Sequence, residues 1–119
     1  MTNEELENRL VDFGLLVIEI AESLQNSKAS SHIAGQMIRS GTSPAFNYGE
    51  ARDAESSNDF IHKLKIVLKE LRETNVALKF IQKGKLCEEQ KKVQIALKEN
   101  NELISIFVTT IRTKRNKMS

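Results

Sequence analysis

Apolar residues recur along this chain at spacings of three and four residues in four separate stretches. This spacing places side chains on one face of an α-helix. The stretches predict helices over about residues 4–26, 31–55, 57–83 and 88–114, joined by short turns. Four amphipathic helices with short connections pack as an antiparallel up-down-up-down bundle. We therefore predict an all-α fold with a single four-helix-bundle domain over residues 1–119.

Residues that cap helices support several of these boundaries. Thr2 with Glu5, and Ser56 with Asp59, have the spacing of a capping box, in which a side-chain oxygen accepts a hydrogen bond from a free backbone N–H group. Gly84 suits the end of the third helix, because glycine readily adopts the left-handed conformation that closes many helices. These residues set the expected starts of the first and third helices and the expected end of the third.

The predicted second helix contains residues that weaken helices. Residues 39–50 include Gly41, Gly49 and the only proline, Pro44. A proline inside a helix removes one hydrogen bond and clashes with an earlier carbonyl group, at a cost of about 3 kcal/mol. The helix therefore either continues with a kink near Pro44 or breaks at Gly41 and restarts with Ser43 as N-cap. We prefer the kink, because the helical pattern continues beyond the proline, and we interpret both glycines as places of close helix approach or relief of strain.

The same run aligns polar side chains that have candidate partners on the third helix. The residues concerned are Arg39, Ser43, Asn47 and Glu50 on the second helix and Glu70 and Glu73 on the third. We interpret them as a buried structural network in which Arg39 pairs with a glutamate and fixes the register of the two helices. The alternative is a small-ligand or catalytic pocket built from the same arginine and carboxylates.

Three predicted helices carry apolar residues beside their main stripe: Leu15, Ile18, Ile61, Ile66, Leu103 and Ile106. A helix that is apolar on more than one side usually buries the second side as well. In so small a bundle, the expected place for this burial is a contact between subunits, which predicts a homo-oligomer. Asn100 interrupts the stripe of the fourth helix, as a polar residue does where it fixes register or oligomeric state.

Charge is divided unevenly between the two halves of the chain. Residues 1–59 hold 4 Lys/Arg and 10 Asp/Glu, a net charge of −6, whereas residues 60–119 hold 14 and 6, a net charge of +8. The basic cluster Arg112, Lys114, Arg115 and Lys117 is a candidate nucleic-acid contact, which would be led by phosphates and depend strongly on salt. The alternative is a solvated helix end whose cations suit the helix dipole. The cations of the third helix are spread over more than one face.

Other kinds of chemistry find little support in the sequence. A carboxylate-bridged di-metal bundle requires two Glu-x-x-His units and further glutamates, whereas Asp59-x-x-His62 is the sole acid-x-x-His pair of this chain. The sequence also has no phosphate-binding or dinucleotide motif, so we expect no metal, no cofactor and no enzymatic activity. No apolar run approaches the roughly 18 residues of a membrane span, and the N-terminus lacks the pattern of a signal peptide. With Cys87 as its single cysteine, the chain is expected to be cytoplasmic.

The run Arg39-Ser-Gly-Thr-Ser, followed by Asn47 and Glu50-Ala51, resembles the four-helix-bundle protein family. These are bacterial proteins related to those encoded by intervening sequences of 23S ribosomal RNA genes. The similarity continues through Asp59-Phe60-Ile61, Lys63-Leu64 and Lys69-Glu70 to Glu73-Thr74, and extends over about residues 10–110.

This resemblance implies an antiparallel bundle that assembles into a ring, typically a pentamer, with no established enzymatic activity. A distant branch of the family acts as an accessory protein of reverse transcriptases and binds nucleic acid through a basic surface. We therefore expect a non-enzymatic, oligomeric scaffold or interaction protein, with ribosomal RNA or a ribonucleoprotein as a candidate partner. The alternatives are a nucleic-acid-binding accessory protein and a small-ligand pocket at Arg39 and Glu70.

Overall fold

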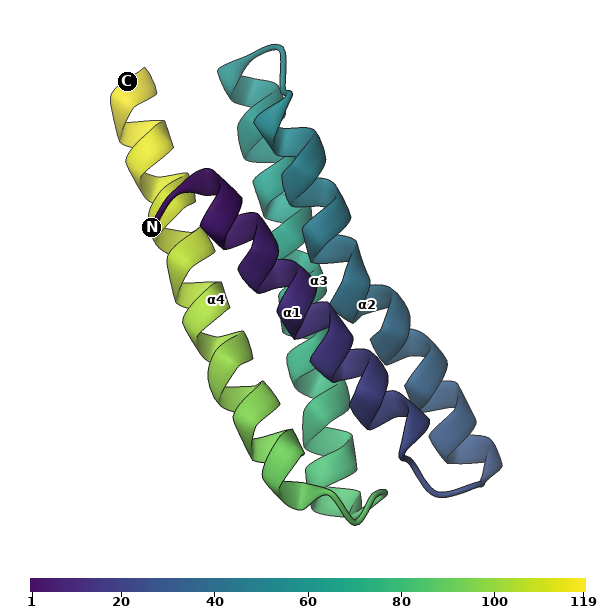
Figure 1. Ribbon diagram of the computed structural model, residues 1–119. Helices are drawn as coiled ribbons and strands as arrows, with labels where there is room; N and C mark the ends of the chain where they lie inside the picture. The colour runs from purple at the N-terminus through teal and green to yellow at the C-terminus, as the bar shows by residue number, and fades with distance from the viewer.

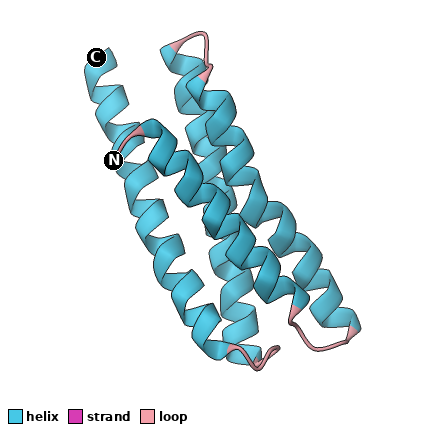
Figure 2. Ribbon diagram, in the orientation of Figure 1, coloured by secondary structure: helices cyan, strands magenta, loops and turns pink.

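The computed structural model describes residues 1–119 and consists of four helices without strands (Figure 2). The helices are α1 (Asn3–Glu22), α2 (Lys28–Arg52), α3 (Ser57–Gly84) and α4 (Gln90–Met118). This confirms the predicted all-α, four-helix fold. The largest differences from the predicted bounds are at two C-terminal ends, because α1 ends at Glu22 rather than near residue 26, and α4 continues to Met118 rather than ending near residue 114.

The helices lie side by side in an elongated bundle measuring 49 × 22 × 21 Å. Figure 1 shows the chain reversing direction at each of the three connections. Helices that follow one another in sequence pack extensively, whereas α1 and α4 touch more sparsely. The diagonal pairs, α1 with α3 and α2 with α4, make no close backbone approach. Helix α2 therefore lies between α1 and α3 and contacts both. None of the four helices is long and apolar enough to cross a membrane.

Side-chain caps begin the first three helices. Thr2, Ser27 and Ser56 each accept a hydrogen bond from the backbone N–H group three residues later, at 3.0, 3.1 and 3.0 Å. This confirms the predicted caps of α1 and α3 and moves the start of α2 a few residues earlier than predicted. The predicted end of α3 is wrong by one residue, because Lys85 rather than Gly84 adopts the left-handed conformation, with a φ of 51°.

Helix α2 continues without interruption through Pro44. The alternative in which the helix breaks at Gly41 is therefore wrong, while the kink near Pro44 stays a prediction. Gly41 lies where α1 comes close to α2: a Cβ atom at this position would be 2.5 Å from Cγ1 of Val17. A Cβ atom on Gly14 of α1 would in turn be 3.2 Å from the carbonyl oxygen of Gly41. These two glycines allow α1 and α2 to pack closely.

A single cluster of 22 buried apolar residues fills the bundle. Ile61 and Leu103 belong to this core, with 7% and 0% of their surface exposed. The prediction that these two residues face another subunit is therefore wrong, because both turn inward beside the main stripe of their helix. Leu15 remains 59% exposed, and the other residues predicted beside the stripes are half-buried.

Candidate functional site

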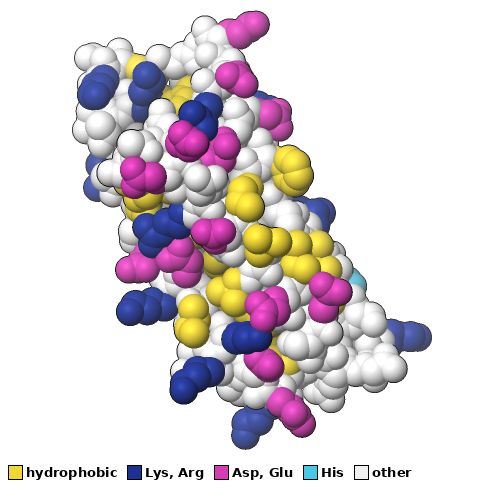
Figure 3. All heavy atoms as spheres, viewed as in Figure 1, with side chains coloured by type: hydrophobic (Ala, Val, Ile, Leu, Met, Phe, Trp, Pro, Cys, Tyr) yellow, Lys and Arg dark blue, Asp and Glu magenta, His cyan; other side chains and the backbone are white.

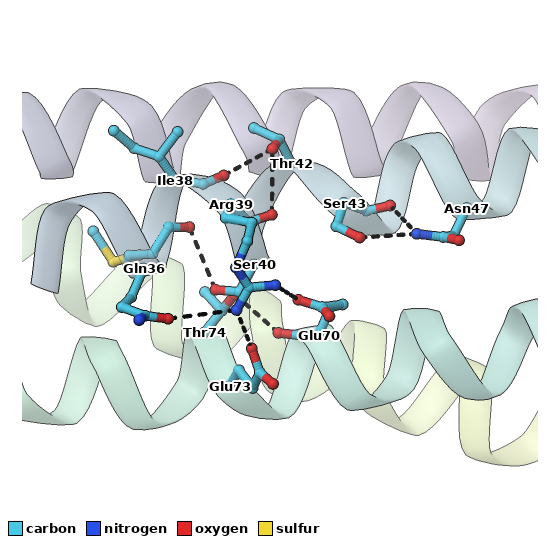
Figure 4. A network of polar contacts seen from close by, with 11 residues as sticks. Gln36, Ile38, Arg39, Ser40, Thr42, Ser43, Asn47, Glu70, Glu73 and Thr74 are labelled. Atoms are coloured by element: carbon cyan, nitrogen blue, oxygen red, sulfur yellow. Dashed lines mark hydrogen bonds and ion pairs between the residues drawn. The ribbon is translucent and has the colours of Figure 1, made fainter.

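Arg39 on α2 bridges two glutamates of α3, as Figure 4 shows. Its Nη1 donates to Oε2 of Glu70 at 2.9 Å, and its Nη2 donates to Oε2 of Glu73 at 2.7 Å. Nη2 also donates to Oε1 of Gln36 at 3.4 Å. The hydrogen bond to Glu73 and the negative charge of Glu70 raise the pKa of Arg39 above its usual value. The guanidinium group therefore stays charged and joins two carboxylates one helical turn apart.

The three members of this bridge differ in burial. The Glu70 side chain is 8% exposed, whereas those of Arg39 and Glu73 are 54% and 39% exposed. The prediction of a fully buried network is thus wrong for Arg39, because a long arginine side chain reaches a buried partner while its charged end stays partly in water. A carboxylate removed from water needs a cation or hydrogen-bond donors. Arg39 supplies both to Glu70.

The remaining members of the predicted network lie in two separate groups. Nδ2 of Asn47 donates to Oγ of Ser43 at 2.8 Å and to the Ser43 carbonyl oxygen at 3.1 Å, so these residues satisfy each other within α2. Glu50 accepts a hydrogen bond from Lys63 of α3 at 3.0 Å. Figure 4 shows the Ser43 and Asn47 side chains apart from the bridge at Arg39. The six residues therefore fall into three separate groups rather than one site.

A buried pair of hydroxyl groups next to the bridge is absent from the sequence prediction. Oγ of Ser40 and Oγ1 of Thr74 lie 2.7 Å apart, and the two residues are 2% and 0% exposed. Thr74 also donates to the Glu70 carbonyl oxygen at 3.1 Å. The sequence contains one sign of this pair: Thr74 occupies a position in the apolar stripe of the third helix where an apolar residue is expected. Together with the Arg39 bridge, the pair fixes α2 against α3 by directional contacts.

A groove of about 530 Å³ lies between α2 and α3 beside this bridge, and we call it the α2/α3 groove. Its polar lining includes Arg39 and Glu73, which already bind each other. Its apolar lining includes Ile33, Val76 and Phe80. A small charged ligand would have to displace the existing ion pair, whereas an apolar side chain would cover exposed apolar surface. The groove therefore suits an apolar group better than a small charged ligand bound at Arg39 and its carboxylates.

A second groove of about 530 Å³ lies between α3 and α4, and we call it the α3/α4 groove. Five cations line it, namely Lys65, Lys69, Arg72, Arg112 and Arg115, together with the apolar residues Leu68, Val108 and Ile111. No acidic residue lines the groove, and none of the five cations forms an ion pair. The packing of α4 on α3 thus brings into one groove five cations that the sequence pattern had assigned to more than one helix face.

The four basic residues predicted near the C-terminus do not act as one set. Arg112 and Arg115 line the α3/α4 groove. Lys114 instead places its Nζ atom 5.5 Å from the centre of the Phe60 ring, and Lys117 lies in the last turn of α4 outside the groove. Sequence reasoning did not select Lys65, Lys69 and Arg72 of α3 as their partners. No three His, Cys, Asp or Glu side chains lie close enough to hold a metal ion.

Comparisons with known proteins agree with this architecture. The model of the family described as 23S rRNA-intervening sequence protein matches residues 5–107. A solved crystal structure of a protein with unknown function, from the S23 ribosomal protein family of Bacteroides thetaiotaomicron, is 26% identical and superposes with a TM-score of 0.83. The similarity covers 94% of this chain and 99% of that one. No curated protein matches the chain significantly.

Proposed function

The chain belongs to the family of 23S rRNA-intervening sequence proteins, and we propose that it is a self-associating helical bundle that serves as a scaffold or interaction module. The family match confirms the resemblance carried by residues 39–74. Neither the family description nor that of the solved neighbour states a reaction. The family resemblance also makes a ring of five copies the expected form of the assembly.

The observation that supports self-association is the large apolar surface left outside a filled core. Phe46, Phe80, Leu15 and Val76 are 73%, 61%, 59% and 53% exposed. Figure 3 shows hydrophobic side chains gathered on the face formed by α1 and α2. Contiguous apolar patches on a soluble domain commonly mark interaction sites, because covering them removes apolar area from water.

Sedimentation velocity and mass photometry at micromolar concentration test this function. The expected result is a defined species heavier than one chain, with the pentamer as the expected size. A single monomeric species at every concentration up to the limit of solubility would contradict self-association.

A second candidate function, binding of structured RNA, is favoured by the α3/α4 groove. Its five unpaired cations present N–H groups that suit phosphate oxygens, and Arg72, Arg112 and Arg115 can each donate two parallel hydrogen bonds. Ribosomal RNA or a ribonucleoprotein in the cytoplasm is the candidate partner. Contacts of this kind carry no base readout, so the affinity is expected to fall steeply as salt rises.

The test compares two charge reversals of equal size on a structured RNA. Lys69→Glu with Arg72→Glu changes the groove, whereas Lys91→Glu with Lys98→Glu changes exposed α4 residues outside the groove. We expect the groove variant to lose about tenfold more affinity for the RNA than the control variant. Its slope of log affinity against log salt should also become shallower by about 0.9 for each lost contact with a duplex phosphate. Absence of binding at low salt, or equal losses in both variants, would exclude the groove as an RNA site.

A further inference from the structure

We propose that neighbouring copies of this chain associate through two different surfaces, with the patch around Phe46 of one copy packed against the patch around Phe80 of the next. The Phe46 patch consists of Val11, Leu15, Ile18 and Phe46. The Phe80 patch consists of Ile33, Val76 and Phe80. This inference rests on the self-association proposed above and identifies the surfaces that carry it.

The two patches lie on different faces of the bundle. The Phe46 patch lines a groove of about 380 Å³ between α1 and α2. The Phe80 patch lines the α2/α3 groove of about 530 Å³. Because α1 and α3 do not approach each other, one copy can offer both patches to two neighbours at once.

The exposed ring of the Phe46 patch has an apolar groove to enter on the other surface. Phe46 is the most exposed large hydrophobic side chain of the molecule, at 73%. The α2/α3 groove offers an apolar wall, with Arg39, Glu73 and Gln36 at its polar edge. A phenyl ring from another copy would cover the exposed faces of Val76 and Phe80, while the ion pair at the edge could stay in place. Such a ring in an apolar hollow is the usual anchor of a protein interface.

The charges around the patches favour this pairing. Helix α1 has six acidic residues and one basic residue, a net charge of −5. Four of its carboxylates lie three or four residues from an apolar member of the Phe46 patch and so border it: Glu7, Asp12, Glu19 and Glu22. Glu7 and Glu19 already pair with Arg52 and Lys92, so Asp12 and Glu22 supply the unpaired negative charge. Helix α3 has six basic and three acidic residues, a net charge of +3. Its exposed Lys79 and Lys83 lie three residues from Val76 and Phe80.

These charges also disfavour the symmetric alternative. Two Phe46 patches placed face to face would bring two acidic borders together, and two Phe80 patches would bring together the lysines beside them. Like charges across an interface cost free energy, whereas opposite borders attract. The pairing of unlike patches is therefore selected. An interface of this kind adds copies one after another and gives a ring where the rotation between neighbouring copies closes.

Mixing two complementary variants tests the proposal. Phe46→Asp disables one patch and Phe80→Asp disables the other, because each places an unpaired carboxylate in an apolar contact. Each variant alone is expected to sediment as a monomer at tens of micromolar. An equimolar mixture is expected to form a dimer, because the first variant keeps its Phe80 patch and the second keeps its Phe46 patch. Ile95→Asp, at a 56% exposed residue of α4 outside both patches, is expected to assemble like the unmodified chain.

Different failures point to different errors. An unmodified chain that stays monomeric overturns the proposed self-association itself. Three results with an unmodified chain that assembles would overturn only the pairing of the two patches. In the first, Phe46→Asp and Phe80→Asp both assemble as well as the unmodified chain. In the others, only one of the two variants loses assembly, or their mixture stays monomeric. Circular dichroism of each variant checks folding, which we expect to persist because both rings are largely exposed.

A charge reversal that keeps both rings provides an independent test. Lys79→Glu with Lys83→Glu is expected to weaken assembly of the full chain at low salt at least about tenfold more than Lys91→Glu with Lys98→Glu, since like charges would then border both patches. Equal effects of the two reversals would overturn the role of charge in this pairing.

Discussion

The hydroxyl groups of Ser40 and Thr74 meet 2.7 Å apart inside the contact between α2 and α3. Both residues are buried, so a hydroxyl that loses its partner there has no water to replace it. Asn100 of α4 is likewise buried, and its Nδ2 donates to the Leu71 carbonyl oxygen of α3 at 2.8 Å. At the scale of the residue, these polar groups are directional contacts inside an otherwise apolar core, and they resist sliding of one helix along another.

A double-mutant cycle measures the contact between Ser40 and Thr74. Ser40→Ala alone is expected to lower the free energy of unfolding by about 1 kcal/mol, because it leaves Thr74 with one buried hydrogen bond fewer. Thr74→Val alone is expected to cost a similar amount. The double variant should lose little more free energy of unfolding than either single variant, because both hydroxyls are then gone and none is left buried without its partner. Urea denaturation provides the measurement, and strictly additive losses would contradict a coupled pair.

The sequence revealed that polar residues interrupt the apolar stripes at Thr74 and Asn100, but it did not reveal their partners. A partner depends on how each helix is rotated about its axis, and a one-dimensional pattern does not contain that rotation. For Arg39 the pattern did indicate the contacting glutamates, because an arginine reaches several positions and Glu70 and Glu73 lie on the adjoining helix. The exposure of Arg39 was not predicted, since the pattern does not distinguish the middle of a helix contact from its edge.

At the scale of the element, the close packing of α1 on α2 depends on Gly41 and on Gly14 opposite it rather than on every glycine of residues 39–50. A Cβ atom on Gly41 would meet Val17 of α1, whereas one on Gly49 would lie 3.6 Å from Oε1 of Glu7, an ordinary contact distance. The sequence suggested the same role for both glycines. Only the observed packing separates them, because it places Gly41 in the contact and leaves space beside Gly49.

Two substitutions in the same helix test this difference. Gly35 has open space around it, so Gly35→Ala is expected to raise the free energy of unfolding by about 0.5–1 kcal/mol through helix propensity. Gly41→Ala gains the same propensity, but its methyl group overlaps the Val17 side chain, so a net loss of about 1–3 kcal/mol is expected. Thermal or chemical unfolding of both variants decides the matter, and a stabilising Gly41→Ala would show that α1 and α2 can separate at little cost.

At the scale of the whole molecule, the charge asymmetry of the sequence becomes an asymmetry between sides. The negative charge lies on α1, whose net charge is −5, whereas α2, α3 and α4 have net charges of +2, +3 and +5. Because each helix returns alongside the previous one, the two halves lie beside each other rather than end to end (Figure 1). The total charge of each half was available from the sequence. The grouping of five cations in the α3/α4 groove was not, because it joins residues far apart in the chain.

Shortening α4 tests how far the core extends. No residue after Ile111 is buried, so a chain ending at Thr113 is expected to keep its free energy of unfolding within about 1 kcal/mol, which allows for the lost contact between Lys114 and Phe60. Its affinity for RNA at low salt should fall, because Arg115 no longer lines the groove. A chain ending before the fully buried Phe107 is the control, and it should lose at least about 3–5 kcal/mol. Equal stability of the two shortened chains would contradict this extent of the core.

Both chain termini lie at the same end of the bundle (Figure 1). This follows from an even number of helices that alternate in direction. A fluorescent protein or an affinity tag joined to either terminus would therefore emerge from that end and leave the opposite end uncovered. In a ring whose copies point the same way, every fused cargo would be displayed on one rim, which makes the bundle a platform for one-sided display.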